Sequence, residues 1–228
     1  MDGVARGGLT DVVPRHVFVA GGTGYLGRRL IPRLLARGHR VRALARPGSE
    51  DRLPSGCDVV KGNALEAATF ASSVAPADTF VQLVGTPHPS PAKAKEFVNV
   101  DLASIRASAS AAASAGIGHF VYVSVAHPAP VMKAYIAVRA EGEALLAAAG
   151  LRATILRPWY VLGPGHRWAY ALAPLYWMAE RVPSTRETAR RLGLVTLGQM
   201  VGALVHAVEH PPEATRIVGV PEIRRGQW

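Results

Sequence analysis

The sequence predicts an α/β protein with a doubly wound parallel sheet, covered by helices on both faces. Two observations support this prediction. Short apolar segments alternate with helical stretches almost to the end of the chain, and such alternation is typical of parallel strands joined by right-handed crossovers. The first apolar segment, 16–20, breaks into a glycine-rich turn at 21–27 that opens a helical stretch. A turn of this kind is typical of an anion-binding site.

The expected strands are short apolar runs bounded by turn residues, and the expected helices are longer stretches between them. The strands are expected at 16–20, 40–45, 58–61, 78–84, 119–124, 152–156 and 216–218. The helices are expected at 28–38, 65–74, 95–115, 132–149 and 197–209. No internal repeat or low-complexity linker interrupts this order.

Length and composition favour a single domain. The chain has 228 residues, of which 49% are hydrophobic, and this is enough for one substantial core. Residues 1–15 carry Gly, Arg and Asp without an apolar segment, and we expect a flexible N-terminal arm there. We expect the domain to comprise residues 16–228, with the substrate-side elements in a short C-terminal extension at 157–228.

The chain is basic, with 26 Lys and Arg against 16 Asp and Glu and a formal net charge of +10. The basic residues are spread along the chain, so no nucleic-acid partner is expected. The charge either favours phosphorylated ligands, an anionic membrane surface or an acidic partner, or only reflects a composition rich in arginine. The single cysteine, Cys57, cannot form an internal disulfide, and no segment resembles a leader or a membrane span. We therefore expect a cytoplasmic protein.

The chemistry of a dinucleotide explains the glycines of the turn. Gly21, Gly24 and Gly27 allow a tight turn, the close approach of a pyrophosphate, and close packing of the helix on the strand. Backbone N–H groups at the helix N-terminus then face the phosphates. The alternative is a glycine-rich turn between unrelated elements, which the following strand at 40–45 argues against. The turn residues expected to contact a dinucleotide are Gly21, Thr23, Gly24, Tyr25, Leu26 and Gly27.

The spacing Gly21-x-x-Gly24-x-x-Gly27, with the apolar runs that follow it, resembles the short-chain dehydrogenase/reductase superfamily. Within it, the chain is similar to the extended and atypical members: epimerase-like, NmrA-like and complex I accessory-subunit-like proteins. The resemblance covers residue 16 to the end and implies a single NAD(P)-binding Rossmann domain. The short region after the sixth strand leaves little chain for a substrate lid, which argues against a full sugar-nucleotide epimerase.

The residue after the second strand bears on the choice of dinucleotide. NAD-binding chains carry an acidic residue there for the ribose 2′-hydroxyl, whereas an arginine accommodates the 2′-phosphate of NADP. The residue here is Arg46, and the nearest acids, Glu50 and Asp51, come later in the loop. We therefore expect NADP(H) to be preferred over NAD(H). The alternative is that Arg46 is a solvated arginine at the end of a strand.

The resemblance implies further cofactor contacts at the ends of later strands. Asn63 and Ala64 stand where relatives place an aspartate and a hydrophobic residue, so Asn63 is expected to act through its side-chain amide. The segment beneath the nicotinamide ribose corresponds to Leu83, Val84 and Gly85. The loop that borders the nicotinamide begins Arg157-Pro158, which adds Pro158 to the expected contacts.

The resemblance also implies a catalytic group. In reductases of this superfamily a tyrosine transfers the proton, a serine orients the substrate oxygen, and a lysine one helical turn after the tyrosine lowers its pKa and holds the ribose. Ser124 and Tyr135 match the serine and the tyrosine, but Arg139 replaces the lysine. Arginine keeps the positive charge but does not release a proton. Catalysis and a relic of catalysis are therefore both open.

The aromatic-rich segment 168–179 also has more than one interpretation. It contains Pro174 and is too short for a membrane span. It fills the core, lines an apolar substrate pocket, or contacts a membrane surface or a protein partner. His88 and His127 each precede a proline in loops and are expected to be solvated, and no spacing of Cys, His and acidic residues suggests a metal site.

Two hypotheses for function follow. The first is an NADP(H)-dependent oxidoreductase that acts on a small carbonyl or hydroxyl substrate, with Tyr135 as acid or base, Ser124 orienting the substrate and Arg139 holding the ribose. The second is a protein that binds the dinucleotide without turnover, either a redox sensor or a structural accessory subunit. The arginine at 139 favours the second hypothesis, while the preserved serine and tyrosine favour the first.

Overall fold

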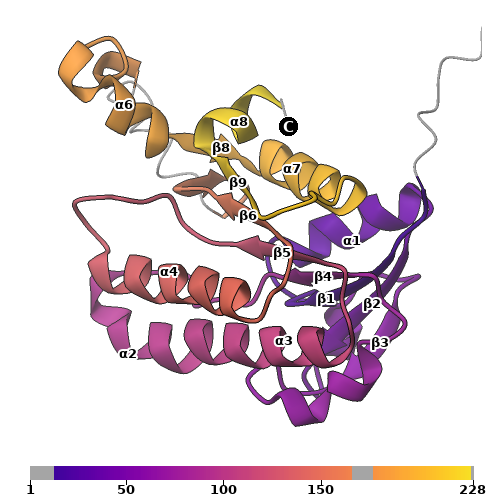
Figure 1. Cartoon of the computed structure of the whole chain (residues 1–228). Coiled ribbons are helices and arrows are strands. Elements are labelled where there is room, and N and C mark those ends of the chain that lie inside the picture. Colours follow the sequence, from indigo (N-terminus) through magenta and orange to yellow (C-terminus); the bar gives the residue numbers. More distant parts are fainter. Residues whose placement is uncertain (1–12, 166–176, 227–228) are drawn as a thin grey trace, which may run out of the picture.

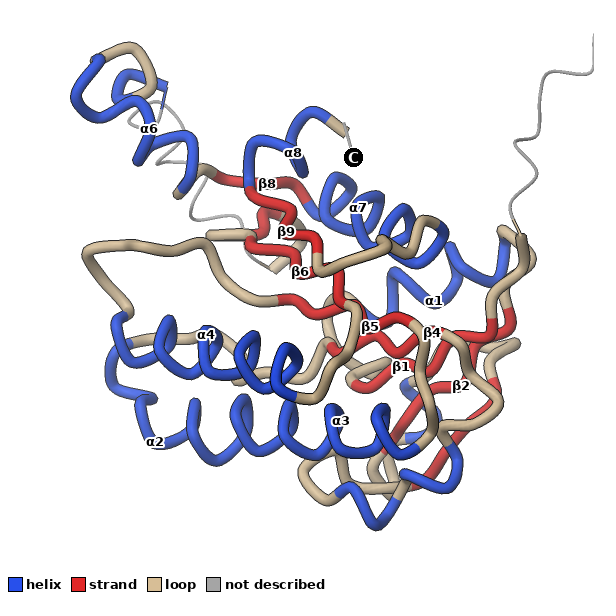
Figure 2. Tube along the Cα trace, viewed as in Figure 1, coloured by secondary structure: helices blue, strands red, loops and turns tan. Residues whose placement is uncertain are grey.

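A computed structural model describes residues 13–165 and 177–226 of the chain. Its centre is a seven-stranded parallel sheet with the strand order β3-β2-β1-β4-β5-β6-β9 (Figures 1 and 2). This confirms the predicted doubly wound α/β fold. The strands of this sheet are β1 (His16–Ala20), β2 (Arg40–Ala45), β3 (Asp58–Lys61), β4 (Thr79–Gln82), β5 (His119–Val123), β6 (Ala153–Arg157) and β9 (Arg216–Gly219).

Helices cover both faces of the sheet, as Figure 1 shows. The two faces have separate cores, one under α3 and α4 and the other under α1 and α7. The helices are α1 (Gly27–Ala36), α2 (Ala94–Glu96), α3 (Ala103–Ser114), α4 (Lys133–Ala148), α6 (Pro183–Arg191), α7 (Leu197–Glu209) and α8 (Val220–Arg225). No helix in the described part of the chain is both long and apolar enough to cross a membrane.

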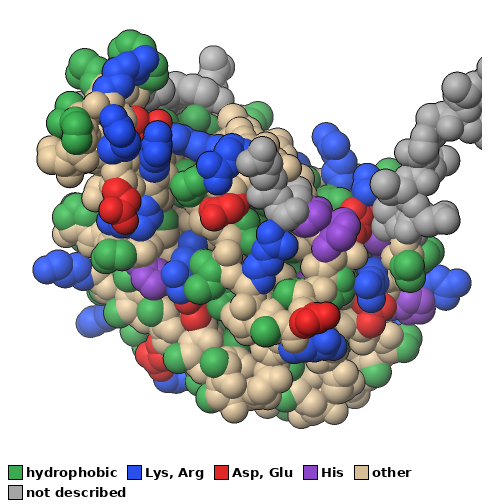
Figure 3. Space-filling model, turned by 45° about the horizontal axis from the view of Figure 1, so that its top comes forward, with side chains coloured by type: hydrophobic (Ala, Val, Ile, Leu, Met, Phe, Trp, Pro, Cys, Tyr) green, Lys and Arg blue, Asp and Glu red, His purple; other side chains and the backbone are tan. Residues whose placement is uncertain are grey.

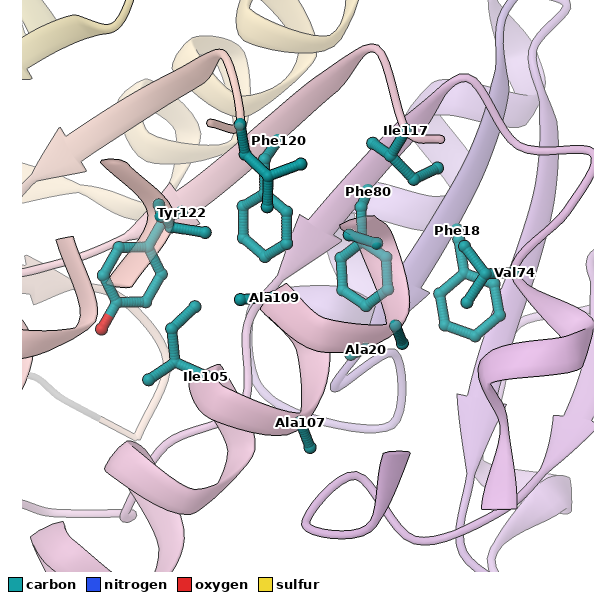
Figure 4. Close-up of a cluster of buried hydrophobic side chains, with 14 of the residues drawn as sticks. Phe18, Ala20, Val74, Phe80, Ile105, Ala107, Ala109, Ile117, Phe120 and Tyr122 are labelled. Atoms are coloured by element: carbon teal, nitrogen blue, oxygen red, sulfur yellow. The ribbon is translucent and has the colours of Figure 1, made fainter. Parts of the chain in front are cut away.

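A row of aromatic rings fixes the register of the central strands. Phe18, Phe80 and Phe120 are partners in the ladder of β1, β4 and β5. Their ring centroids lie 5.1 and 5.0 Å apart. The row faces α3, where Ala107 and Ala109 are buried, and small side chains let that helix approach the rings closely (Figure 4). Because the register is fixed, the carboxyl ends of these strands lie along one edge of the sheet.

Two expected helices differ in the structure. The stretch 65–74 forms two 3₁₀ turns, Ala67–Thr69 and Ala71–Ser73, in place of an α-helix. The Thr69 hydroxyl donates to the carbonyl of Glu66 and accepts from the amide of Asn63, and such local bonds compete with helix formation. The long helix expected at 95–115 contains a π-helical segment, Phe97–Leu102, before α3 begins.

The C-terminal extension contains elements that the sequence did not predict. Two three-residue strands, β7 (Tyr160–Leu162) and β8 (Leu194–Thr196), pair in parallel as a second small sheet. Helix α8 packs against β8, and α6 packs against α8. Strands of three residues are too short to show an alternating pattern of apolar and polar residues, so no period in the sequence indicates them.

The predicted N-terminal arm falls mainly on residues outside the described part of the chain. Its last residue, Arg15, is already bound to the domain: its amide donates to His39 Nδ1 at 3.0 Å, and its carbonyl accepts from the Arg40 amide. The boundaries of arm and domain otherwise remain a prediction.

Candidate functional site

The turn between β1 and α1 has two glycines that packing requires. Gly21 has a φ of +89°, and a Cβ there would lie 2.8 Å from the carbonyl carbon of Leu83, in the backbone after β4. A Cβ on Gly27 would lie 2.6 Å from the Cα of Gly22. These two positions therefore accept only glycine because other backbone segments approach them closely.

Gly24 is different, because protein packing does not explain it. Among the described residues, a Cβ there would meet only the Gly21 carbonyl oxygen, at 3.1 Å. The missing side chain leaves an open cradle in front of the N-terminus of α1. That helix has no side-chain cap and no acidic residue in its first turn, so its first N–H groups suit an anion. The cradle thus fits the pyrophosphate of a dinucleotide.

The other residues expected to contact a dinucleotide belong to the same turn. Thr23, Tyr25 and Leu26 are partly buried. The guanidinium carbon of Arg29 lies 4.4 Å from the ring centroid of Tyr25, and its Nη1 donates to the Tyr25 carbonyl at 2.8 Å. This contact stabilises the conformation of the turn and places a positive charge beside it.

Arg46 is exposed directly after β2. Its neighbour Arg42 is occupied, because its Nη1 donates to the carbonyls of Ser73 and Ala75 at 2.8 and 2.7 Å. Glu50, the nearest acid along the chain, already forms an ion pair, with its Oε1 3.0 Å from Lys61 Nζ. Within the described residues, the guanidinium of Arg46 forms no hydrogen bond or ion pair. It is therefore available to an anion beyond the end of the strand.

Asn63 is held in a local turn. Its Nδ2 donates to Glu66 Oε1 at 2.7 Å, and its Oδ1 accepts from the Leu65 amide at 3.1 Å. Ala64 packs against the core. An adenine contact through the amide of Asn63 would have to replace the bond to Glu66, so that contact stays a prediction.

The ends of β4 and β6 lie where the sequence placed them. Leu83 continues β4, because its amide donates to the Ala20 carbonyl at 2.9 Å. Val84 follows it, within 2.9 Å of the position of a Cβ on Gly21. Pro158 is buried after β6, and its carbonyl accepts from the Ala126 amide at 2.9 Å. The cradle and the ends of these strands therefore share one edge of the sheet.

One face of α4 carries two of the predicted catalytic residues, Tyr135 and Arg139, together with Glu143. Tyr135, Arg139 and Glu143 are spaced four residues apart, and such positions are neighbours on a helix surface. The guanidinium carbon of Arg139 lies 5.1 Å from the ring centroid of Tyr135. Its Nη1 donates to the carbonyl of Val123, the residue before Ser124, at 3.0 Å. Arg139 thus connects Tyr135 to the end of β5.

Arg139 is also one half of a buried ion pair. Its Nη2 lies 2.5 Å from Asp101 Oδ1. The other oxygen of Asp101 accepts from the amide and hydroxyl of Thr86, at 3.0 and 2.6 Å. A Cβ on Gly85 would collide with Arg139 Nη2. Gly85 therefore makes room for this guanidinium, which lies directly against the backbone after β4.

Burial disfavours the charge of Arg139, but Tyr135, Tyr122 and Asp101 outweigh it and raise the pKa of the guanidinium above its ordinary value. The residue is therefore charged at any physiological pH. Both Nη atoms bond to protein acceptors. This geometry supports an electrostatic action of Arg139 on Tyr135 and does not support the predicted role of holding the ribose.

Ser124 is buried, and its hydroxyl donates to Glu143 Oε1 at 2.6 Å. Glu143 also accepts from Arg157, whose Nε lies 3.0 Å from Oε1 and whose Nη2 bonds to Oε2. Burial would raise the pKa of Glu143, but the hydrogen bonds from Arg157 and Ser124 lower it overall. The ionised carboxylate thus accepts the single hydroxyl proton of Ser124.

Sequence reasoning missed the partners of these residues. Glu143 stands on the predicted helix four residues after Arg139, and its spacing could have shown it. Asp101 and Thr86 have no such pattern, because only the tertiary fold brings Asp101 to Arg139 and Thr86 to Asp101.

A cavity of about 450 Å³ opens between α6 and the ends of β5, β6 and β9. Most of its lining residues belong to the C-terminal extension. Residues lining it are Ala126, His127, Arg157, Pro183, Arg186, Glu187, Arg190, Arg191, Ile217, Gly219, Val220, Pro221 and Glu222.

Most of the aromatic segment 168–179 lies outside the described residues. Trp177 and Met178 are described and are 60% and 55% exposed. Arg181 lies over the Trp177 ring, 3.1 Å from its centroid. The three interpretations of the rest of the segment stay open. Across 13–165 and 177–226, no group of three His, Cys, Asp or Glu side chains is arranged to hold a metal.

A family described as NAD(P)H-binding matches residues 21–170. The chain is 29% identical over 234 residues to a 3-diazoavenalumate denitrifying reductase of Streptomyces sp, a match that covers 91% of this chain and 76% of the relative.

Solved structures share the fold. WbmH of Bordetella bronchiseptica in complex with NAD+ has a TM-score of 0.66 and 20% identity, over 90% of this chain and 75% of that chain. The UDP-glucose 4-epimerase of Thermus thermophilus in complex with NAD has a TM-score of 0.65 and 18% identity, over 92% of this chain and 81% of that chain. The resemblance to the short-chain dehydrogenase/reductase superfamily is thereby confirmed: the chain belongs to the NAD(P)H-binding family and has the extended, epimerase-like form of that superfamily's Rossmann fold.

Proposed function

We propose that this protein is an NADPH-dependent reductase in which Tyr135 gives the proton to the substrate. The observation that carries the proposal is the position of the Arg139 guanidinium. It lies against the ring of Tyr135, bonds to the carbonyl before Ser124, and fills the space under Gly85. The relative named as a reductase supports the same reaction class.

The open cradle at Gly24 and the uncapped start of α1 would hold the pyrophosphate. Arg46 would bind the 2′-phosphate, because its guanidinium is exposed and its acidic neighbour Glu50 is paired with Lys61. This supports NADPH over NADH. When bound, the cofactor supplies a hydride, and every other group that the reaction needs comes from the chain.

Each residue has a separate task in this proposal. The phenol of Tyr135 donates a proton at the atom that gains electrons, and the fixed positive charge of Arg139 stabilises the resulting phenolate. To orient the substrate oxygen, the Ser124 hydroxyl would have to donate to it in place of Glu143, which accepts its proton in the free protein. Glu143 and Arg157 hold the serine hydroxyl in place.

The test is turnover of NADPH by the purified protein against aldehydes, ketones, quinones and an aryl diazonium salt. The last is included because the relative's name describes a diazo compound. We expect Tyr135→Phe to lower kcat at least a hundredfold while the Kd for NADPH stays within twofold, because the change deletes one hydroxyl and keeps the ring. Unchanged turnover in this variant would contradict the role of Tyr135.

A second candidate function is dinucleotide binding without turnover, as a redox sensor or a structural accessory subunit. Two observations favour it: Arg139 has both Nη atoms on protein acceptors, and the Ser124 proton is taken by Glu143. This function predicts no NADPH oxidation with any member of the panel. It also predicts that Tyr135→Phe changes neither turnover nor the affinity for NADPH.

A further inference from the structure

We propose that the cavity between α6 and the ends of β5, β6 and β9 binds the anionic group of the substrate, a carboxylate or a phosphate monoester on an apolar body. This inference rests on the proposed function, because it assigns the substrate class of the same reductase. The cavity's volume of about 450 Å³ is in the range of small-molecule sites.

The charges around the cavity are unequal. Four arginines line it, Arg157, Arg186, Arg190 and Arg191, against two glutamates. Glu187 has a side chain that is 95% exposed and lies 3.7 Å from Arg191. Glu222 is engaged at the start of α8, where it accepts from the Gly219 amide at 3.0 Å. Neither carboxylate therefore neutralises Arg186 or Arg190.

Two arginines of α6 retain donors for a ligand. Arg186 donates only to the carbonyls of Glu180 and Arg181, at 3.1 and 3.5 Å, and has no acidic partner among the described residues. Arg190 is exposed and forms no hydrogen bond or ion pair with any residue that the structure describes. Guanidinium groups bind carboxylate and phosphate oxygens in a planar, bidentate way. Figure 3 shows Lys and Arg side chains gathered around helix α6.

The cavity wall leads directly to the candidate catalytic residues. Arg157 lines the cavity and bonds to Glu143, which in turn holds Ser124. His127, also in the wall, has its Nε2 buried and 3.6 Å from the same carboxylate. An anion bound at α6 would therefore place the rest of its molecule toward Ser124 at the edge of the sheet.

The remaining wall is apolar and suits the body of such a ligand. It is formed by Ala126, Pro183, Ile217, Val220 and Pro221. An apolar wall with a few convergent polar groups is typical of a small-molecule site. It does not suit an extended polyanion, which would need basic residues in a continuous stripe.

Binding can be measured without turnover. We suggest calorimetric titration of the NADPH-loaded protein with benzoate, phenyl phosphate and the neutral benzamide. Benzoate or phenyl phosphate is expected to bind at least tenfold more tightly than benzamide, and the better of the two identifies the anionic group. Arg190→Ala should weaken anion binding about tenfold without affecting folding, because no residue that the structure describes bonds to this side chain. Arg190→Lys should recover part of the loss.

Arg33→Ala is the matched control, because Arg33 is an exposed helix arginine on α1 and its removal changes the net charge equally. It should leave the anion affinity within twofold. The proposal is wrong if none of the three probes binds at 10 mM, if benzamide binds as well as the anions, or if both arginine variants have the same effect. If the protein reduces aldehydes but binds the anions no more tightly than benzamide, only the inference about the anion site is refuted. If it binds the anions but shows no turnover, only the proposed reductase function is refuted.

Discussion

Arg139 carries a guanidinium group where the lysine of the superfamily carries an ammonium group, and the residues around it suit a guanidinium. Arg139 reaches Asp101 and the Val123 carbonyl with two separate nitrogens. A lysine has one nitrogen at the end of a flexible chain and could not keep both contacts in the same planar geometry. The arginine therefore keeps the positive charge next to Tyr135 by anchoring it in the protein.

This ion pair predicts a large stability effect. Asp101→Ala would leave Arg139 buried without its carboxylate, which costs about 3–5 kcal/mol of the free energy of unfolding. Urea denaturation measures it. The matched control is Glu141→Ala, which removes an ion pair with Arg106 whose side chains are 46% and 56% exposed, and it should cost less than about 1 kcal/mol. Equal losses of unfolding free energy in the two variants would show that the buried ion pair contributes no more to stability than the exposed one.

His119 predicts a dependence of stability on pH. It is buried and bonds to Thr154 Oγ1 at 2.9 Å. Burial, aided by the charges of Arg15 and Arg152 against Asp78, lowers the pKa of His119 from 6.5 to about 4. In the unfolded chain the histidine gains its proton near pH 6.5, and in the folded chain only near pH 4. The stability from the neutral histidine is thus complete above pH 6.5 and declines as the pH falls toward 4.

We expect the wild-type chain to lose up to about 3 kcal/mol between pH 6.5 and 4 through this residue. His119→Gln keeps a hydrogen-bonding group but does not titrate, so its unfolding free energy should fall less over the same interval. Chemical denaturation at pH 7, 5.5 and 4 measures the difference. Parallel curves for the two proteins would disprove the assignment.

The predictable part of the site was the part that depends on local spacing. Tyr135 and Arg139 are one helical turn apart, and Ser124 ends an apolar run, so the sequence placed all three on the correct elements. Asp101 lies in the π-helical segment Phe97–Leu102. That segment changes the helical phase, so no 3.6-residue period could show that this carboxylate turns inward to Arg139.

At the scale of elements, the β1–α1 turn separates glycines needed for folding from the glycine left open for a ligand. Gly24→Val should keep the fold, because its Cβ would meet one atom at 3.1 Å, yet it should abolish NADPH binding by filling the cradle. Gly27→Val should lower stability by about 1–3 kcal/mol or more, because its Cβ would overlap the backbone of Gly22.

Thermal denaturation and NADPH titration of both variants distinguish these effects. The expected pattern is a near-native melting temperature without NADPH binding for Gly24→Val, and a clearly lower melting temperature for Gly27→Val. Native affinity for NADPH in the Gly24 variant would mean that the cradle does not hold the cofactor.

The elements of the sheet could be predicted because each strand is a buried apolar run with a clear end. The helix expected at 65–74 was wrong, since side chains such as Thr69 bond locally and two 3₁₀ turns suffice for so short a connection. The pairing of β7 with β8 joins chain segments more than thirty residues apart. Only the packing of the extension against the end of the sheet determines such a contact.

For the whole molecule, the site is a consequence of the strand order. The order β3-β2-β1-β4-β5-β6-β9 changes direction between β1 and β4, where the chain crosses from one side of the sheet to the other. A crevice forms outside the carboxyl ends at such a point. The glycine turn, Gly85 and Ser124 all follow strands that end at this edge. One core on each face of the sheet keeps these ends fixed relative to one another.

Because the cofactor would bind the folded chain alone, its affinity should appear as a change in global stability. At a concentration of 100 Kd, NADPH should stabilise the protein by about 2.7 kcal/mol, which for a chain of this size raises the melting temperature by about 5–10 °C. NADH at the same concentration should raise it by roughly half as much if its affinity is about tenfold lower, as expected when Arg46 binds the 2′-phosphate.

Arg46→Glu should remove or reverse this difference without changing the melting temperature of the free protein, since the guanidinium of Arg46 is exposed and has no partner among the described residues. Equal shifts with NADPH and NADH in the wild-type protein would show that Arg46 is only a solvated arginine at the end of β2.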